Sequence, residues 1–227
     1  MRSELTTYED WIQLLALANT GDNIAQYEVA IHYDGGLVVN GIKIVDESQP
    51  VAFKWYYSAY ENGNVDASIR IADFLIEGIH CKQNIELAIE LYRKGIDDGS
   101  GIAANNLAAF YRDKQNYKEA FELYKIAQHL YNSDSLSLAL CYYFGIGTVK
   151  DAKMAFEIFK NISKDKSKAG NYQYDIDEAN YFLGRIYLDG EIVEKSITNA
   201  RAFLRLANAD DDHRSARELL MIIGKND

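Results

Sequence analysis

Few side chains in this sequence stand at the spacings that catalysis or metal binding requires. The nearest approach to a metal-binding pair is His80-Cys81, but no third or fourth ligand follows at an interval typical of zinc sites. Gly145-Ile146-Gly147 lacks the third glycine and the preceding strand of a dinucleotide-binding loop, and neither a Walker nor a Gly-x-Ser-x-Gly sequence is present. We therefore predict no catalytic residue, no metal site, no cofactor and no enzymatic activity.

Acidic side chains dominate the charge of the chain. It contains 34 Asp and Glu against 24 Lys and Arg, which gives a formal net charge of −10. Such a charge repels a phosphate backbone and attracts a basic protein, so we expect no binding to nucleic acid. The run Asp210-Asp211-Asp212 lacks the glycine and the spacing of a calcium loop, and we interpret it as the cap of the last helix.

The cysteines and the first residues bear on the cellular compartment. Cys81 and Cys141 are too few for a disulfide framework, and we expect both to be free thiols. Residues 1–18 do not resemble a signal peptide, since acids follow the single Arg2 and Gln13 interrupts a short apolar stretch. No run approaches the roughly 18–20 apolar residues that span a bilayer. We therefore expect a cytoplasmic protein without membrane insertion.

One pattern of small and apolar residues recurs along the chain. A small residue, usually alanine, is followed by an aliphatic residue four positions later, a small one at five, often an aromatic at eight and often a glycine at eleven. The first four positions form one stripe of an α-helix and glycine commonly ends helices, so each copy predicts one helix. The full copies begin at Ala25, Ala67, Ala103, Asp134 and Ala179, and a truncated copy begins at Ala216.

A second helical pattern follows each full copy of the first. It has apolar residues three, four and seven positions after an alanine, and its copies begin at Ala52, Ala88, Ala120, Ala155 and Ala200. The two patterns are 21 residues apart in three copies, from position 67 to 88, from 134 to 155 and from 179 to 200. Such regular pairs predict stacked helical hairpins, because a single hairpin cannot bury its own apolar stripe.

Two segments interrupt the regular spacing. Leu37–Glu47 contains Asn40-Gly41 between apolar stretches, which suits a small β-hairpin with a type I′ turn. Lys164–Asp175 is rich in polar residues and glycine, so we predict an exposed loop. We expect one all-α domain over residues 1–227, an α-solenoid (an α/α superhelix) of about five to six hairpins. Its predicted parts are an N-terminal half-repeat helix at about 5–20, repeats at about 22–64, 65–99, 101–131, 134–165 and 176–211, and a C-terminal helix at about 214–224.

These repeats resemble the Sel1-like repeat family, whose members are close relatives of tetratricopeptide repeat proteins. Residues 179–207 carry the resemblance best, with Leu183-Gly184 and Tyr187 at the family positions, and nearly the whole chain follows the pattern. The third repeat departs from it, because Asp113-Lys114-Gln115-Asn116 replaces the glycine loop. The resemblance implies a solenoid of Sel1-like hairpins with an adaptor or regulatory role.

The resemblance to tetratricopeptide repeats also implies which side chains bind a partner. Positions one before and two, six and nine after the first alanine lie off the buried stripe, and by that resemblance they face a concave groove lined by the first helices. The alternative is that the solenoid winds tightly and buries several of these side chains. The predicted partner-binding residues are Tyr27, Asp34, Asp66, Ile69, Asp73, Asn105, Arg112, Tyr143, Tyr181 and Arg185.

The sequence thus predicts a non-catalytic protein-protein interaction module that binds a partner protein in its concave groove. Because the net charge of −10 attracts a basic protein, one candidate is a bacterial immunity protein that neutralises a cognate toxin or effector. The resemblance implies this role for small acidic members of the family. The alternative is a signalling or assembly adaptor that binds a short peptide or a membrane-protein tail.

Overall fold

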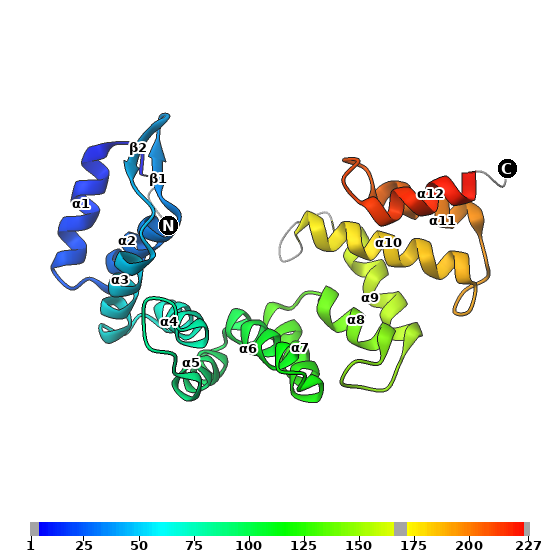
Figure 1. The fold of residues 1–227 in the computed structure, drawn as a ribbon, viewed down its shortest axis with the longest axis horizontal. Coiled ribbons are helices and arrows are strands. Elements are labelled where there is room, and N and C mark those ends of the chain that lie inside the picture. Colours follow the sequence, from blue (N-terminus) through cyan, green and yellow to red (C-terminus); the bar gives the residue numbers. More distant parts are fainter. Residues whose placement is uncertain (1–4, 166–171, 225–227) are drawn as a thin grey trace. The chain divides into compact units, whose positions relative to one another are not determined.

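The computed structural model describes residues 5–165 and 172–224 (Figure 1). These residues form twelve helices and one two-stranded sheet. The chain divides into two compact units, an N-terminal unit of residues 1–106 and a C-terminal unit of residues 107–227. The repeats continue through this division, because helix α6 (Gly101–Asp113) contains residues of both units. The predicted all-α repeat fold is confirmed.

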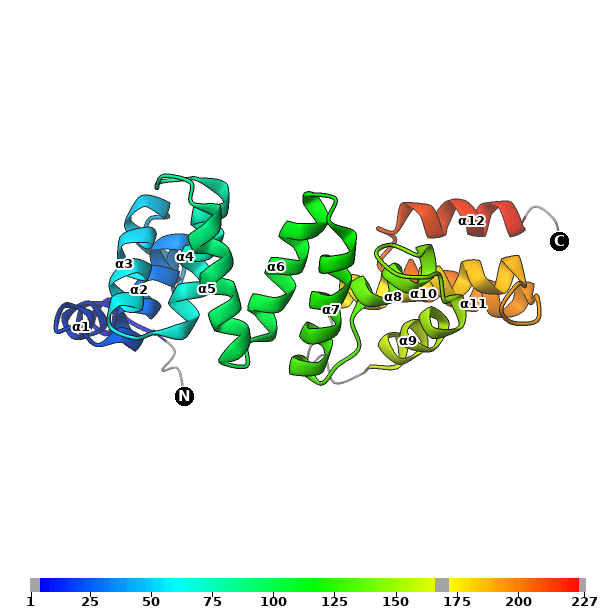
Figure 2. The same cartoon turned by 90° about the horizontal axis from the view of Figure 1, so that it is seen from below.

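The N-terminal unit consists of the single helix α1 and the hairpins that follow it. Helices α2 to α5 lie side by side in this unit (Figure 2). Its elements before α6 are α1 (Tyr8–Asn19), α2 (Asn23–Gly35), β1 (Leu37–Val39), β2 (Ile42–Val45), α3 (Gln49–Glu61), α4 (Val65–Glu77) and α5 (Ile85–Asp97).

The C-terminal unit continues the pairs and ends on a single helix. Its elements after α6 are α7 (Tyr117–Tyr131), α8 (Leu136–Phe144), α9 (Ala152–Lys164), α10 (Gln173–Asp189), α11 (Ile197–Ala207) and α12 (Arg214–Gly224). The first pattern of the sequence lies on α2, α4, α6, α8 and α10, which we call the first helices. The second pattern lies on α3, α5, α7, α9 and α11, the second helices.

Local sequence signals begin and end these helices. At the start of α4, Asn64 accepts a hydrogen bond from the Ala67 backbone N–H at 2.9 Å. The same helix ends at Gly78, whose φ of 69° is the left-handed conformation that glycine adopts without steric cost. The third repeat lacks this glycine, and the chain after α6 instead takes a left-handed conformation at Gln115, with φ 60°.

Small residues let the two helices of a hairpin approach closely. The alanines that begin the patterns are at most 2% exposed on every described copy. Gly184 on α10 shows why, because a Cβ added there would lie 2.6 Å from Cγ of Leu204 on α11. A larger side chain at this position would push the two helices apart.

The predicted β-hairpin is confirmed and completes the core of the N-terminal unit. Asn40 and Gly41 both have positive φ, 52° and 78°, as a type I′ turn requires. Leu37, Val39 and Val45 turn inward from β1 and β2 and pack in one cluster with Trp11 and Leu14 of α1. The hairpin, inserted between the two helices of the first repeat, thus covers apolar surface of α1.

Aromatic rings fill the core of the C-terminal unit. Phe159 on α9 is fully buried, and its ring stacks on Phe182 of α10 with centroids 5.1 Å apart. Leu183, Ile162 and Ile186 are also at most 1% exposed in this cluster. The apolar stripes of successive hairpins therefore meet in a shared core, as the repeat pattern predicts.

The predicted loop at Lys164–Asp175 is wrong at both ends. Helix α9 continues to Lys164 and α10 already begins at Gln173, while residues 166–171 lie outside the described residues. Lys164 lies in the last turn of α9 and Asp175 in the first turn of α10, where their charges complement the helix dipoles. The same polar composition therefore suits helix ends as well as a loop.

Candidate protein-binding site

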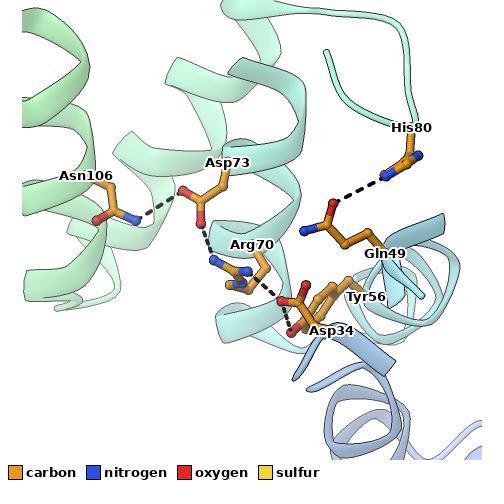
Figure 3. Close-up of polar contacts among 7 residues, drawn as sticks. All are labelled: Asp34, Gln49, Tyr56, Arg70, Asp73, His80 and Asn106. Atoms are coloured by element: carbon orange, nitrogen blue, oxygen red, sulfur yellow. Dashed lines mark hydrogen bonds and ion pairs between the residues drawn. The ribbon is translucent and has the colours of Figure 1, made fainter. Parts of the chain in front are cut away.

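Two predicted acids of the N-terminal unit are bridged by an arginine. The Arg70 guanidinium on α4 donates hydrogen bonds to Asp34 Oδ2 on α2 at 2.6 Å and to Asp73 Oδ2 on α4 at 2.8 Å (Figure 3). These side chains are partly accessible, with exposed fractions of 39% for Arg70, 18% for Asp34 and 23% for Asp73. Because two carboxylates face one guanidinium, the group keeps one negative charge.

Hydroxyl and amide donors extend this group to neighbouring helices. Tyr56 on α3 donates to Asp34 at 3.3 Å, while Tyr92 on α5 and Asn106 on α6 both donate to Asp73 Oδ1. We call these six residues the polar row: Asp34, Tyr56, Arg70, Asp73, Tyr92 and Asn106. It links five successive helices, α2 to α6, by charged and polar contacts.

The polar row changes the acidity of its members. Burial and then the charge of Asp34 raise the pKa of Tyr56 to about 12. Burial and the carboxylate of Asp73 raise the pKa of Tyr92 well above its usual range. Burial lowers the pKa of Arg70, but the hydrogen bond to Asp34 and the charge of Asp73 outweigh it and the pKa is raised. Both tyrosines of the polar row are therefore neutral and Arg70 is charged near neutral pH.

The third predicted acid, Asp66, does not join the polar row. It lies exposed in the first turn of α4, and no hydrogen bond or ion pair connects it to the described residues. The three predicted acids therefore form one partly neutralised pair, Asp34 and Asp73, and one free carboxylate. Of the three acids, only Asp66 has no counter-ion among the described residues.

The remaining predicted residues of the N-terminal unit differ in their exposure. Tyr27 on α2 is half-buried, with its ring centroid 5.6 Å from that of Tyr56, and Asn105 on α6 is half-buried as well. Ile69 on α4 is only 3% exposed and lies beside Gly95 of α5. Its side chain belongs to the core, so the prediction of a groove-facing residue is wrong for Ile69 and the burial alternative holds there.

Arg112 is an exposed residue near the end of α6. Its guanidinium donates to Asp113 Oδ1 at 2.9 Å, and the two side chains are 53% and 67% exposed. The hydrogen bond to Asp113 is the main cause of its raised pKa. Because both side chains of this pair are exposed to solvent, the pair contributes little stability.

Three predicted residues of the C-terminal unit lie in an aromatic group. The Tyr143 ring on α8 is 5.2 Å from Phe182 of α10. Arg185 places its Cζ 5.9 Å from the centroids of both Tyr181 and Phe182. Tyr181 in turn lies 4.9 Å from the ring of His213 at the start of α12. The first helices of this unit therefore present aromatic rings and a guanidinium in place of the polar row.

Arg70 and Asn106 were not predicted from the sequence. Each stands three positions after the first alanine of its repeat, at Ala67 and Ala103, and this position was not among those expected to face a groove. One signal was available, because Arg70 and Asp73 are three residues apart on a predicted helix and can form an ion pair there. The bond from α6 to α4 could not be found in this way, since it depends on how the hairpins stack.

The cysteines and histidines take part in local contacts. The Cys81 thiol donates to the Phe74 carbonyl at 3.4 Å, and His80 lies 3.3 Å from the side-chain oxygen of Gln49 (Figure 3). Burial raises the pKa of both the Cys81 and the Cys141 thiol. Within residues 5–165 and 172–224, no three His, Cys, Asp or Glu side chains lie close enough to share a metal ion. No described helix has the length and apolar character needed to cross a membrane.

A hollow of about 620 Å³ opens beside α7, α8 and α9 in the C-terminal unit. Lys125 and His129 line it from α7, Glu157 and Asn161 from α9, and Tyr142 from α8. None of the partner-binding residues predicted from the sequence contributes to this hollow. Its mixed polar and charged walls select no single ligand.

The repeated helix pairs define a helical-hairpin repeat protein, whose first helices carry the polar row in one unit and the aromatic group in the other. The Sel1 repeat model matches residues 23–64, 65–100, 101–127, 136–166 and 177–212. The chain belongs to the Sel1 repeat family. Proteins of this family generally mediate protein-protein interaction as non-catalytic scaffolds.

Solved structures share the fold at low sequence identity. One is c5321, a protective antigen of uropathogenic Escherichia coli that displays an SLR fold, with 24% identity, a TM-score of 0.75 and 96% of this chain covered. The present chain spans only 45% of that antigen. A Sel1 repeat protein from Oxalobacter formigenes has 21% identity and a TM-score of 0.69, with 94% of this chain and 80% of that one covered. No curated protein sequence matches the chain.

Proposed function

We propose that the side chains on the first helices bind a partner protein. The general role of the family supports this proposal, as does the kind of residue found there. The N-terminal unit offers the partly exposed carboxylates of the polar row and the free carboxylate of Asp66. The C-terminal unit offers tyrosine rings and arginine, which are enriched at the energetically important positions of interfaces.

The partner in this proposal is a basic protein. The chain carries a net charge of −10, and the polar row and Asp66 add negative charge to the first helices of the N-terminal unit. Opposite charges accelerate association and fix orientation, and salt weakens both effects. Exposed Asp66 is the single observation that carries this step, because its charge is not neutralised within the described residues.

The narrower form of the proposal is that the partner is a toxin or effector and that binding neutralises it. An immunity protein of this kind forms a stable complex of fixed stoichiometry and dissociates slowly. The competing role is an adaptor that binds a short peptide or a membrane-protein tail and leaves its partner active. The two roles differ in the activity of the bound partner and in the dissociation rate.

Affinity purification from the native host with the full chain as bait identifies the partner. The affinity and the association rate of the purified partner are then measured with the wild type, with Asp66→Lys and with the matched control Glu86→Lys. Both acids are exposed and lie in the first turn of a helix, Asp66 on the first helix α4 and Glu86 on the second helix α5. We expect Asp66→Lys to weaken binding by about tenfold, mainly through slower association at low salt, and Glu86→Lys to change it little.

Equal effects of the two variants would contradict binding on the first helices. Full activity of the partner in a saturated complex would contradict neutralisation and favour the adaptor role. Failure of any purified protein to bind the chain reversibly and stoichiometrically would contradict the proposed function as a whole.

A further inference from the structure

Arg185 on α10 has no counter-ion within residues 5–165 and 172–224. It is half-buried, and its only described contacts are those of the guanidinium with the rings of Tyr181 and Phe182, both at 5.9 Å. A guanidinium carries five N–H donors in one plane. When it stacks on rings, its edge stays available for hydrogen bonds, so Arg185 is held in place while its donors remain unused.

The contrast with Arg70 shows how a partly buried arginine of this chain is satisfied when acids lie close to it. Arg70 is also partly buried, and two carboxylates hold its guanidinium at 2.6 and 2.8 Å. Acids outnumber bases by 34 to 24, so counter-ions are plentiful. An unpaired, half-buried guanidinium in such a chain points to an anion supplied from outside.

Two aromatic side chains of α8 lie beside Phe182, the ring on which Arg185 stacks. Burial raises the pKa of Tyr143, and the positive charge of Arg185 partly offsets that rise. The Tyr143 hydroxyl donates a hydrogen bond to none of the described residues. The neighbouring Phe144 ring lies 4.9 Å from Tyr143 and 5.9 Å from Phe182, yet 52% of this residue is exposed. A second donor and an exposed apolar face therefore accompany the guanidinium.

Two acids near Tyr143 restrict the kind of anion that fits. Asp189 stands four residues after Arg185 on α10, and within residues 5–165 and 172–224 no ion pair joins Arg185 to Asp189 or Glu191. Burial is the main cause that raises the pKa of Tyr143, and the charges of these two acids act in the same direction. Their negative charge opposes a dianionic phosphate more strongly than a singly charged carboxylate. A carboxylate next to an apolar side chain satisfies both the guanidinium and Phe144.

We propose that Arg185 binds an Asp or Glu side chain of the partner protein, with Tyr143 as a second donor and Phe144 packing on an adjacent apolar residue. This inference rests on the proposed function and adds the chemistry of one contact. A partner that is basic overall then places one acid at Arg185, which fixes the register of the complex through a bidentate, charge-assisted pair.

The test uses a capped peptide, acetyl-Gly-Leu-Glu-Phe-Gly-amide, and its isosteric Gln counterpart. NMR of the full chain follows the Nε–Hε resonance of Arg185 and the ring resonances of Phe144 during titration. We expect the Glu peptide to shift both sets of resonances, and the Gln peptide to bind at least about tenfold more weakly because the charge-assisted pair is lost. Arg185→Gln should abolish the difference, whereas Arg205→Gln on the exposed surface of α11 should preserve it.

Further arms separate the sources of the anion. The Gln peptide with a free C-terminus tests a terminal carboxylate, and inorganic phosphate tests a general anion site; equal binding of either would overturn the assignment to an acidic side chain. No shift at Arg185, or equal binding of the Glu and Gln peptides, would overturn it as well. Asp189→Asn should tighten the Glu peptide, because a competing negative charge is removed.

If Arg185→Gln loses its fold in circular dichroism, the wild-type titration and Arg185→Lys decide the question. A partner complex that is unchanged by Arg185→Gln would overturn this inference and leave the proposed function intact. If the Glu peptide binds selectively but no protein partner of the chain is found, the site is supported and the proposed function is contradicted.

Discussion

The Arg70 guanidinium lies 2.6 Å from Asp34, although the two residues belong to different hairpins. This contact connects α4 to α2, and the second bond of Arg70, to Asp73, places it next to the donors from α5 and α6. The acids of these first helices are thereby partly neutralised and fixed in position. An acidic surface that is already ordered loses little side-chain entropy when a partner binds.

Removal of Arg70 should destabilise the protein. Arg70→Ala leaves Asp34 and Asp73 partly buried without their common counter-ion, so we expect a loss of about 1–2 kcal/mol, less than for a fully buried pair because Arg70 is 39% exposed. Urea unfolding followed by circular dichroism measures this loss. The control is Arg214→Ala, whose pair with Glu218 is solvated and worth at most about 0.5 kcal/mol. Similar losses in both variants would show that the polar row adds nothing.

High pH should weaken folding through the buried tyrosines. The pKa of Tyr56 is about 12 in the folded protein, against about 10 in an unfolded chain. The stability that this group contributes is therefore complete below pH 10 and is lost as the pH rises from about 10 to 12, by about 1.4 kcal/mol per unit of pKa difference. Tyr92, whose pKa is also raised, acts in the same direction.

Urea unfolding between about pH 9 and pH 11 checks this slope. Tyr56→Phe should flatten the decline, while Tyr8→Phe, which changes a residue that is 56% exposed, should not. A decline of the same steepness in the wild type and in Tyr56→Phe would contradict the assignment to Tyr56.

The repetition of small and apolar residues made most of the fold predictable. Ala67 and Ala88 mark helices that must bury one face, and both are fully buried. Asn40-Gly41 predicted a turn because its backbone conformation is open to few other residue pairs. The start of α10 at Gln173 was missed, because a polar first turn and a loop have the same composition.

The candidate site was less predictable, because it depends on distances between helices. Periodicity indicates that Asp34 and Asp73 leave the apolar stripe, but it gives no separation between α2 and α4. Arg70 therefore remained unnoticed, although it determines the charge of both acids. In the same way, the burial of Ile69 follows from its packing beside Gly95, which no pattern within one helix reveals.

Gly184→Ala should show how closely the helices of the last hairpin approach. The new methyl group would lie 2.6 Å from Cγ of Leu204, which is fully buried. Overpacking of this kind costs about 1–3 kcal/mol, although alanine recovers roughly 0.5–1 kcal/mol of helix propensity. The matched control is Gly35→Ala near the end of α2, where no atom lies within 4 Å and a small gain is expected. Thermal unfolding of the two variants should move in opposite directions, and a stabilised Gly184→Ala would contradict the packing described for α10 and α11.

Two phenylalanines of the C-terminal unit should separate stability from binding. Phe159→Ala removes a fully buried ring that stacks on Phe182, so we expect a cost of about 3–5 kcal/mol from the cavity that remains. Phe144→Ala removes a ring that is 52% exposed, so it should cost about 1 kcal/mol or less. Because Phe144 lies beside Phe182, on which Arg185 stacks, the same change should still weaken binding of the partner by about tenfold. Urea unfolding measures the free energy of unfolding, and titration with the purified partner measures the affinity, both on one preparation of each variant. If Phe144→Ala unfolds the protein, the ring belongs to the core and the separation described here is wrong. If the variant binds its partner as tightly as the wild type does, the exposed ring has no part in recognition.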